Sequence, residues 1–348
     1  MDDNLLDIMI RDMETSPSLY RPTDFWIQGM KEIVEELRQS DLAEFRAMTG
    51  TRRFFVPSYA FPGYLDRPDM LAEVIQAAGT VNSRQELAIK GYFSGELQAE
   101  CDYRVFKATV TDSHPYLDQV SESTVGNPVE QFVFDGRRYS RSMLNYLLGL
   151  NFIKQHCDLS DVNTVLEIGG GFGTLGEIFL GDERNHCFYI DVDIPPTGFV
   201  ASWYLQQVFG ADNIGAYDVL RNEKLDITEL RQRYRGVVLC PWQLPDLAGK
   251  VDLLVNFISF QEMEPEVVQN YLNQVDRLGA KYVLLRNLRE GKQKATGDSL
   301  GVREPVKGDD YDDFLPNYRL VAANTVPFGY RTVDGFHSEL RIYQRKAQ

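Results

Sequence analysis

A glycine-rich turn carries the clearest chemical signal in the chain. The segment reads Val165-Leu166-Glu167-Ile168-Gly169-Gly170-Gly171-Phe172-Gly173, an apolar run that meets several glycines just before a helical pattern begins. Glycine lets the backbone turn tightly and approach a ligand closely, and the first turn of the following helix offers partial positive charge. The segment therefore predicts a cofactor cradle that includes Gly169, Gly171 and Gly173.

Acidic residues near this turn indicate which cofactor it holds. Glu167 lies in the apolar run, where S-adenosylmethionine (SAM) sites carry an acid that anchors the amino-acid end of the cofactor. A lone carboxylate in a buried strand is otherwise costly. Asp191 and Asp193 follow about 20 residues after the glycines, where a carboxylate can bind a ribose diol. These acids favour SAM, while the match of residues 171–176 to G-x-G-x-x-G keeps a nicotinamide dinucleotide, and hence an oxidoreductase, as the alternative.

The elements that must position these residues alternate between strand-like and helix-like runs. Such alternation is typical of a parallel sheet with helices on both faces. The final two strand-like runs have no helical pattern between them, so we expect a Rossmann-like, doubly wound α/β sheet of seven strands whose terminal strand is antiparallel. The predicted strands are 162–169, 186–194, 236–242, 251–259, 281–288, 318–328 and 338–346, and the predicted helices are 140–156, 174–180, 201–209 and 265–278.

The first 135 residues have a different pattern. Apolar residues recur at helical spacing over 26–37, residues 70–78 end at a glycine as a helix does, and Ser83-Arg84-Gln85-Glu86 offers a capping box for another helix. The aromatic, proline-broken stretch 52–68 cannot be one regular element. We expect a mainly helical region, 1–135, that caps or dimerises beside a catalytic domain, 136–348.

With these motifs the sequence resembles the class I SAM-dependent methyltransferases and, more narrowly, the bacterial putative sugar O-methyltransferases. The resemblance rests on DFW near the start, the Phe45-Arg46 pair, VLEIGGGFGTLGEIFL, YIDVDIPP with SWYLQQVFG, VNFISFQEM and the closing GFHSELRIYQR. It implies that Glu167 and the glycines hold the methionine side of SAM and that Asp193, or its rival Asp191, holds the ribose. It also implies adenine contacts at Trp242 and Gln243, beside the third strand, and substrate contacts at Ser259 and Gln261, after the fourth.

Methylation of a sugar hydroxyl needs a general base, because such a hydroxyl is a poor nucleophile at neutral pH. Ligands of an open α/β sheet bind at the carboxyl ends of the strands, which disfavours His156 and His186 and leaves His114 unplaced. His337 begins the terminal antiparallel strand and should lie at the ligand end. Glu262 follows the fourth strand, and a pairing between Glu262 and His337 would unite the two candidates.

The remaining features concern the acceptor. Tyr59, Phe61 and Tyr64 either belong to the core or line the acceptor pocket, as aromatic faces often do for sugars. Asp309, Asp310, Asp312 and Asp313 could bind a cation, but no metal-ligand spacing is evident, so we expect no metal.

Composition excludes several classes of protein. There are 36 Lys and Arg against 51 Asp and Glu, a net charge of −15, which argues against a nucleic-acid partner. No signal peptide or membrane-spanning run is visible, and the four scattered cysteines suit a reducing cytoplasm. The predicted protein is thus a cytoplasmic SAM-dependent O-methyltransferase of a sugar on a glycan or glycosylated metabolite, and a homodimer is one predicted assembly. A methyltransferase of a non-sugar molecule such as a polyketide, or a scaffold without turnover, is the alternative.

Overall fold

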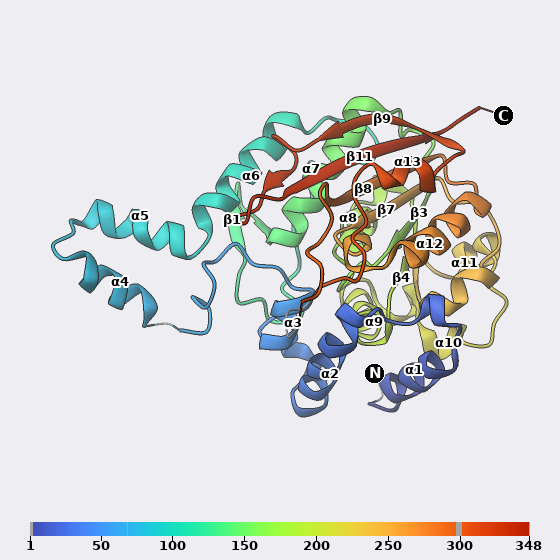
Figure 1. Cartoon of the computed structure of the whole chain (residues 1–348), viewed down its shortest axis with the longest axis horizontal. Coiled ribbons are helices and arrows are strands. Elements are labelled where there is room, and N and C mark those ends of the chain that lie inside the picture. Colours follow the sequence, from blue (N-terminus) through green and yellow to red (C-terminus); the bar gives the residue numbers. More distant parts are fainter. Residues whose placement is uncertain (1–2, 68, 297–300, 348) are drawn as a thin grey trace.

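The computed structural model, which describes residues 3–67, 69–296 and 301–347, contains a nine-stranded mixed sheet (Figure 1). Its order is β5-β6-β4-β3-β7-β8-β11, with both β9 and β10 paired to β11. The strands β3, β4, β5, β6, β7 and β8 are parallel to one another, and β11 runs antiparallel to β8 and β9. The predicted doubly wound α/β fold with an antiparallel terminal strand is therefore confirmed.

All seven predicted strands are present, and the structure adds two short ones to the sheet. The sheet strands are β3 (Thr164–Ile168), β4 (Phe188–Val192), β5 (Ile214–Gly215), β6 (Gly236–Leu239), β7 (Leu253–Phe257), β8 (Tyr282–Leu288), β9 (Tyr318–Asn324), β10 (Tyr330–Arg331) and β11 (His337–Arg345). The additions are β5 and β10, two residues each, which are too short to leave a periodic pattern in the sequence.

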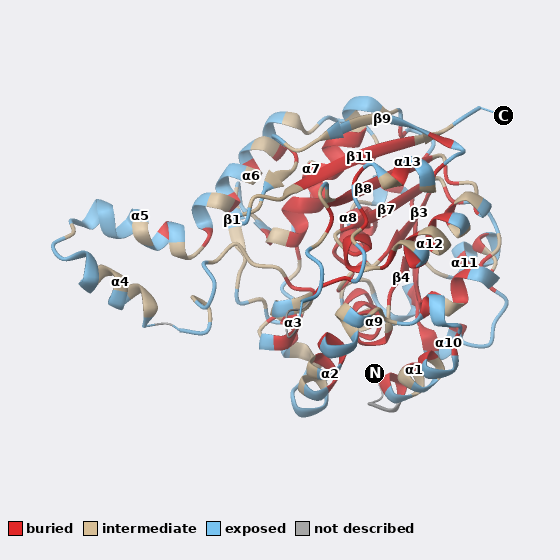
Figure 2. Cartoon of the chain, viewed as in Figure 1, coloured by how far each residue is buried: buried red, intermediate tan, exposed pale blue. Residues whose placement is uncertain are grey.

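Helices cover both faces of the sheet, so the central strands are buried on both sides (Figure 2). Val165 of β3 packs into the core with α7 (Arg141–His156), α8 (Thr174–Gly181) and α9 (Pro195–Phe209). Leu166, its neighbour in β3, points to the other face, in the core with α11 (Ile227–Arg233), α12 (Pro265–Arg277) and α13 (Asp310–Phe314). The short α10 (Tyr217–Leu220) lies beside β6. Because side chains alternate along a strand, Glu167 points to the same face as Val165, towards α7.

The N-terminal region is helical and packs mainly on the first of these faces. It contains α1 (Asp3–Thr15), α2 (Asp24–Gln39), α3 (Thr49–Phe54), α4 (Met70–Ala78), α5 (Ser83–Phe93) and α6 (Glu96–Thr109). Tyr20, in the turn before α2, packs against α12 on the second face. Helix α1 contacts α9, and α6 contacts α7. The α4–α5 hairpin projects from the body (Figure 1), and α4 has no buried residue.

One local prediction needs correction. The capping box of α5 is made by Asn82 and Gln85, one residue earlier than the predicted one at Ser83, because the Asn82 side chain accepts from the Gln85 amide at 3.0 Å. The predicted boundary at residues 135–136 falls in the turn of a hairpin formed by β1 (Phe132–Phe134) and β2 (Arg137–Tyr139), whose three-residue strands were not predicted.

Candidate active site

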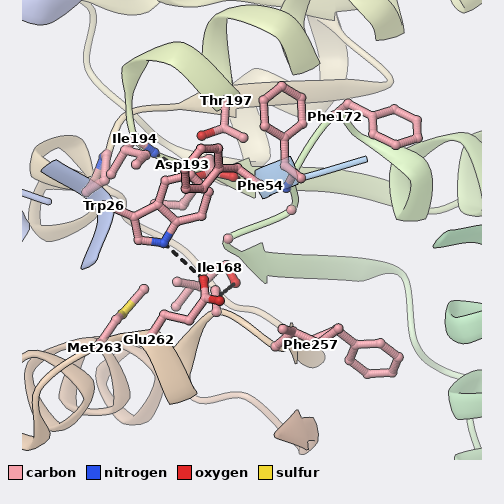
Figure 3. Close-up of a pocket in the computed structure, with 18 of the residues that line it drawn as sticks. Trp26, Phe54, Ile168, Phe172, Asp193, Ile194, Thr197, Phe257, Glu262 and Met263 are labelled. Atoms are coloured by element: carbon pink, nitrogen blue, oxygen red, sulfur yellow. Dashed lines mark hydrogen bonds between the residues drawn. The ribbon is translucent and has the colours of Figure 1, made fainter. Parts of the chain in front are cut away.

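A cavity of about 180 Å³ lies where β3, β4 and β7 end (Figure 3). One side is formed by the glycine turn Gly169–Phe172, with Asp193 and Thr197 beside it, and another by the segment after β7, including Ser259 and Glu262. The N-terminal region closes the cavity with residues just before and at the start of α2, and with residues at and just after the end of α3: Arg21, Pro22, Thr23, Trp26, Phe54, Phe55 and Pro57. The strand pattern predicts the sheet side of this cavity. The DFW motif at residues 24–26 includes Trp26, but it does not show that residues 21–26 form a wall of the cavity.

The glycine turn exposes its backbone to the cavity at Gly171. A Cβ atom added there would approach only Phe55, at 3.7 Å and beyond, and φ is +65°. By contrast, a Cβ on Gly169 would lie 2.2 Å from the Ser259 hydroxyl, so this glycine allows the end of β7 to approach the turn. The turn thus offers bare backbone to a ligand at the start of α8.

Two of the predicted acids lie behind the turn. Glu167 and Asp191 face each other across β3 and β4, both are fully buried, and neither lines the cavity. The Tyr189 hydroxyl donates to Glu167 Oε2, whereas Glu167 Oε1 and both Asp191 oxygens have no partner among the described residues. Burial raises the pKa of Glu167 to about 7 and that of Asp191 well above its usual value. A Cβ on Gly170 would lie 2.5 Å from Asp191, so these acids back the turn directly.

Asp193 is the acid that lines the cavity. Its carboxylate accepts hydrogen bonds from the amides of Gly171 at 3.0 Å and Ile194 at 2.7 Å. The pKa of Asp193 is raised to about 7, chiefly by burial and to a smaller extent by the charge of Glu262, although the hydrogen bonds from those amides and from Thr197 act to lower it. Of the two acids considered for a ribose, only Asp193 is therefore within reach of a ligand in this cavity.

Glu262 lies across the cavity from Asp193, in the 3₁₀ turn Phe260–Glu262. The Trp26 indole donates to its Oε2 at 3.1 Å, and the Lys292 ammonium donates to its Oε1 at 2.6 Å. Its backbone oxygen accepts from the Thr23 hydroxyl at 2.8 Å. Burial raises the pKa of Glu262, and the charge and hydrogen bond of Lys292 lower it in part. A carboxylate has four lone-pair sites, so Glu262 can still accept a proton.

None of the four histidines lines the cavity. His337 Nδ1 lies 2.6 Å from Glu290 and 2.8 Å from Arg289, so the pairing between His337 and Glu262 does not occur. Strand β11 is three strands from β3, and strands are spaced about 4.8 Å apart, which places its start well to the side of the glycine turn. His114 contacts the Val162 carbonyl, before β3, at the opposite end of the sheet.

Several other predicted contacts are also outside the cavity. Trp242 donates to the Tyr217 hydroxyl, and Gln243 bonds the backbone of Cys240 and Leu220, although Pro241 beside them does line the cavity. Gln261 accepts from the Leu288 amide. Ser259 does line the cavity and hydrogen-bonds the Ile168 carbonyl.

The predicted aromatic contacts, Tyr59, Phe61 and Tyr64, are absent from the lining too. The Tyr59 hydroxyl donates to Asp102 at 2.5 Å, and Tyr64 packs against Phe93. Aromatic residues of the N-terminal region do reach the cavity, but they are Trp26, Phe54 and Phe55.

The Phe45-Arg46 pair braces the glycine turn from outside the cavity. The ring centroids of Phe172 and Phe45 are 5.5 Å apart, and the Arg46 guanidinium carbon lies 5.0 Å from the centroid of the Phe172 ring. Arg46 forms a buried ion pair with Glu122 at 2.7 Å. The N-terminal region therefore fixes the turn as well as covering the cavity.

The acidic run near α13 makes protein contacts. Asp309 pairs with Arg341, Asp310 accepts from the Lys307 amide, and Asp312 accepts from the Tyr343 hydroxyl, each at 2.7 Å.

Among the described residues, no helix has both the length and the apolar character required to cross a bilayer.

No known family profile and no curated protein matches the sequence. Among solved structures, the chain is similar to a Burkholderia thailandensis 1,6-didemethyltoxoflavin-N1-methyltransferase with bound S-adenosylhomocysteine (SAH), at 15% identity and a TM-score of 0.41 over 60% of this chain and 79% of that one. It is similar to the mitomycin 7-O-methyltransferase MmcR at 9% identity and a TM-score of 0.39, over 99% and 74% of the two chains. It is also similar to the Synechocystis magnesium protoporphyrin IX methyltransferase ChlM with bound SAM, at 13% identity and a TM-score of 0.37, over 59% and 79%. Likeness at this level does not assign a function.

Proposed function

We propose that this protein is a SAM-dependent O-methyltransferase acting on a hydroxyl of a small molecule. One observation carries the proposal: a glycine turn with Asp193 lies on one side of the cavity, and a buried carboxylate, Glu262, lies on the other. The first side suits a nucleoside with a charged tail, and the second suits a group that gives up a proton. The order of the sheet supports it, because β11 inserts antiparallel between β8 and β9, whereas dinucleotide folds continue in parallel.

The residues around the turn fit the cofactor. The Asp193 carboxylate would bind the ribose hydroxyls, and the backbone at Gly171 would let the cofactor approach closely. Glu167 and Asp191 lie behind Gly170 and have three unpartnered oxygens. A sulfonium or ammonium group bound in front of the turn would favour the charged forms of these two acids without touching them. SAM supplies an electrophilic methyl group, so the chain has to position the acceptor oxygen and take its proton.

Glu262 is the proposed general base. It is the carboxylate that faces Asp193 in the cavity, and its raised pKa brings its basicity closer to that needed at neutral pH. Trp26 and Lys292 hold its two oxygens in place, so the remaining lone pairs are fixed in direction. Trp26 also brings helix α2 to the site, which makes the N-terminal region part of the catalytic unit.

For the acceptor, we propose a sugar hydroxyl of a glycosylated metabolite. Trp26, Phe54 and Phe55 line the cavity, and aromatic side chains in such a lining can stack on a sugar ring. They would also accept a planar polyketide, which is the second candidate. We further propose, from the charge of −15, that the acceptor is not a nucleic acid.

Two measurements test the proposal. Calorimetric titration with SAM, SAH and NAD(P) should give binding of the first two only, and binding of NAD(P) without SAM would overturn the cofactor assignment. Incubation with SAM and panels of glycosides and polyketides, followed by mass spectrometry, should show a product heavier by one methylene. Cofactor binding with no methylated product in any panel would favour a scaffold without turnover.

A further inference from the structure

A second hollow lies between α1 and α2, next to the candidate active site. Its floor is made by Met13, Met30 and Val34, which are buried, and its walls include Ile10 and Ile27, the latter 46% exposed. Charged residues of both signs line its edges: Glu14, Lys31, Glu35 and Arg38. We call it the α1–α2 groove. Its volume is about 850 Å³, within the usual range for small-molecule sites.

The groove adjoins the active-site cavity. Arg21 and Pro22, just before α2, line both. Further along α2, Arg38 pairs with Asp7 of α1 at 2.5 Å and bridges the two helices. From Ile27 to Arg38, α2 rises about 16 Å at 1.5 Å per residue, so the groove could accommodate an extended chain of that length.

We propose that the α1–α2 groove binds an apolar portion of the methyl acceptor, while the acceptor hydroxyl lies in the cavity beside Glu262. This inference rests on the proposed function and narrows it: the acceptor is an amphipathic small molecule, such as a glycoside with an apolar aglycone, and not a free polysaccharide. A recessed groove between two bridged helices suits a narrow ligand better than a flat lipid surface, because Met30 and Val34 lie at its floor.

The physical consequence is a dependence of affinity on the length of the apolar portion. Each methylene group moved from water into an apolar site strengthens binding about fourfold. The gain should stop once the chain reaches the Asp7–Arg38 ion pair. A carboxylate placed on the groove wall should abolish the gain, because a chain docked there would leave that charge without water.

The test is calorimetric titration of the full chain, saturated with SAH, with methyl, butyl, hexyl and octyl β-D-glucoside, each below its micelle concentration. We expect Kd to fall by up to about fourfold per methylene. Ile27→Glu should remove this dependence, and Gln28→Glu, an exposed neighbour on α2 outside the groove lining, should retain it. SAH affinity should be equal in all three proteins.

Three results would overturn the inference: equal Kd for methyl and octyl glucoside or no binding of either, an unchanged length dependence in Ile27→Glu, or a dimer in sedimentation that Ile27→Glu alone dissociates. The last would assign the groove to a second copy of the chain. Failure of SAH to bind would instead refute the proposed function, so the two failures are distinguishable.

Discussion

Replacing Glu262 by glutamine tests the proposed chemistry most directly. The substitution keeps the size of the side chain and an oxygen that can accept from Lys292 or Trp26, but it removes the basic carboxylate. A positioned general base contributes about 10²- to 10⁴-fold to rate, so kcat should fall by that factor. SAM affinity should change little, because Glu262 lies across the cavity from the glycine turn and acts on Asp193 only through charge.

The structure also bounds the effect on folding. Glu262→Gln weakens the charge-assisted bond to Lys292, whose side chain is 20% exposed, and hydrogen bonds to charged groups are worth about 1.5–3 kcal/mol. The release of a buried charge offsets part of this loss. Thermal unfolding of the variant should therefore lie close to that of the wild type, and a large drop in kcat would reflect chemistry and not unfolding.

Glu264→Gln is a matched control. Glu264 is also buried and accepts from the amides of Arg303 and Glu304 at 2.9 and 3.0 Å, but it does not line the cavity. Steady-state release of SAH, measured with an acceptor from the panel, should show kcat unchanged in this control. If Glu262→Gln kept more than about a tenth of the wild-type kcat, the assignment of Glu262 as general base would be refuted, because a loss of less than about tenfold is smaller than a general base should cause.

Three further outcomes follow from the site. Asp193→Asn should weaken SAH binding about 10- to 150-fold, which corresponds to the free energy of a hydrogen bond to a charged group. Because burial raises the pKa of Asp193 to about 7, the SAH affinity of the wild type, measured by calorimetry, should fall from pH 8 to pH 6. The affinity of the variant should not change over this range. Lys292→Met removes the cation that lowers the pKa of Glu262, so the acid limb of the pH profile of kcat should move to higher pH. The pKa of Asp191 is raised in the folded state, so its contribution to stability is present at low pH and is lost as pH rises through that pKa. Thermal denaturation should therefore show a higher unfolding midpoint for Asp191→Asn than for the wild type at pH 8. The difference should vanish near pH 4.

The parts of the site that could be predicted from sequence are local. The glycine turn and Asp193 each follow a strand directly, so the strand pattern fixes both their element and their end of the sheet. Glu262 was found for the same reason, as a residue that follows β7. Alternation along β4 also explains why Asp191 and Asp193 point to one face, but only the structure shows that the turn covers Asp191 and leaves Asp193 open to the cavity.

The parts that could not be predicted depend on long-range packing. The sequence correctly predicts an antiparallel β11, yet the lateral distance of His337 from the glycine turn depends on the order of the strands, which sequence periodicity does not encode. Likewise, Trp26 is one of several apolar residues in α2 at helical spacing. The DFW motif includes Trp26, but nothing local shows that Trp26 lines the cavity while Ile33 is buried in the core, and the partner of Trp26, Glu262, lies 236 residues away.

Under the proposed function, the sheet region would bind the cofactor and the N-terminal region would bind the acceptor. Residues that would hold the cofactor, Gly171 and Asp193, belong to the sheet and its turns, whereas the aromatic cover and the α1–α2 groove belong to residues before 58. Trp26 connects the two, because it contacts the proposed base and lies one residue before Ile27 of the groove wall. Changes in the N-terminal helices could therefore alter the acceptor without disturbing the cofactor cradle, but a change at Trp26 would affect both acceptor binding and the basicity of Glu262.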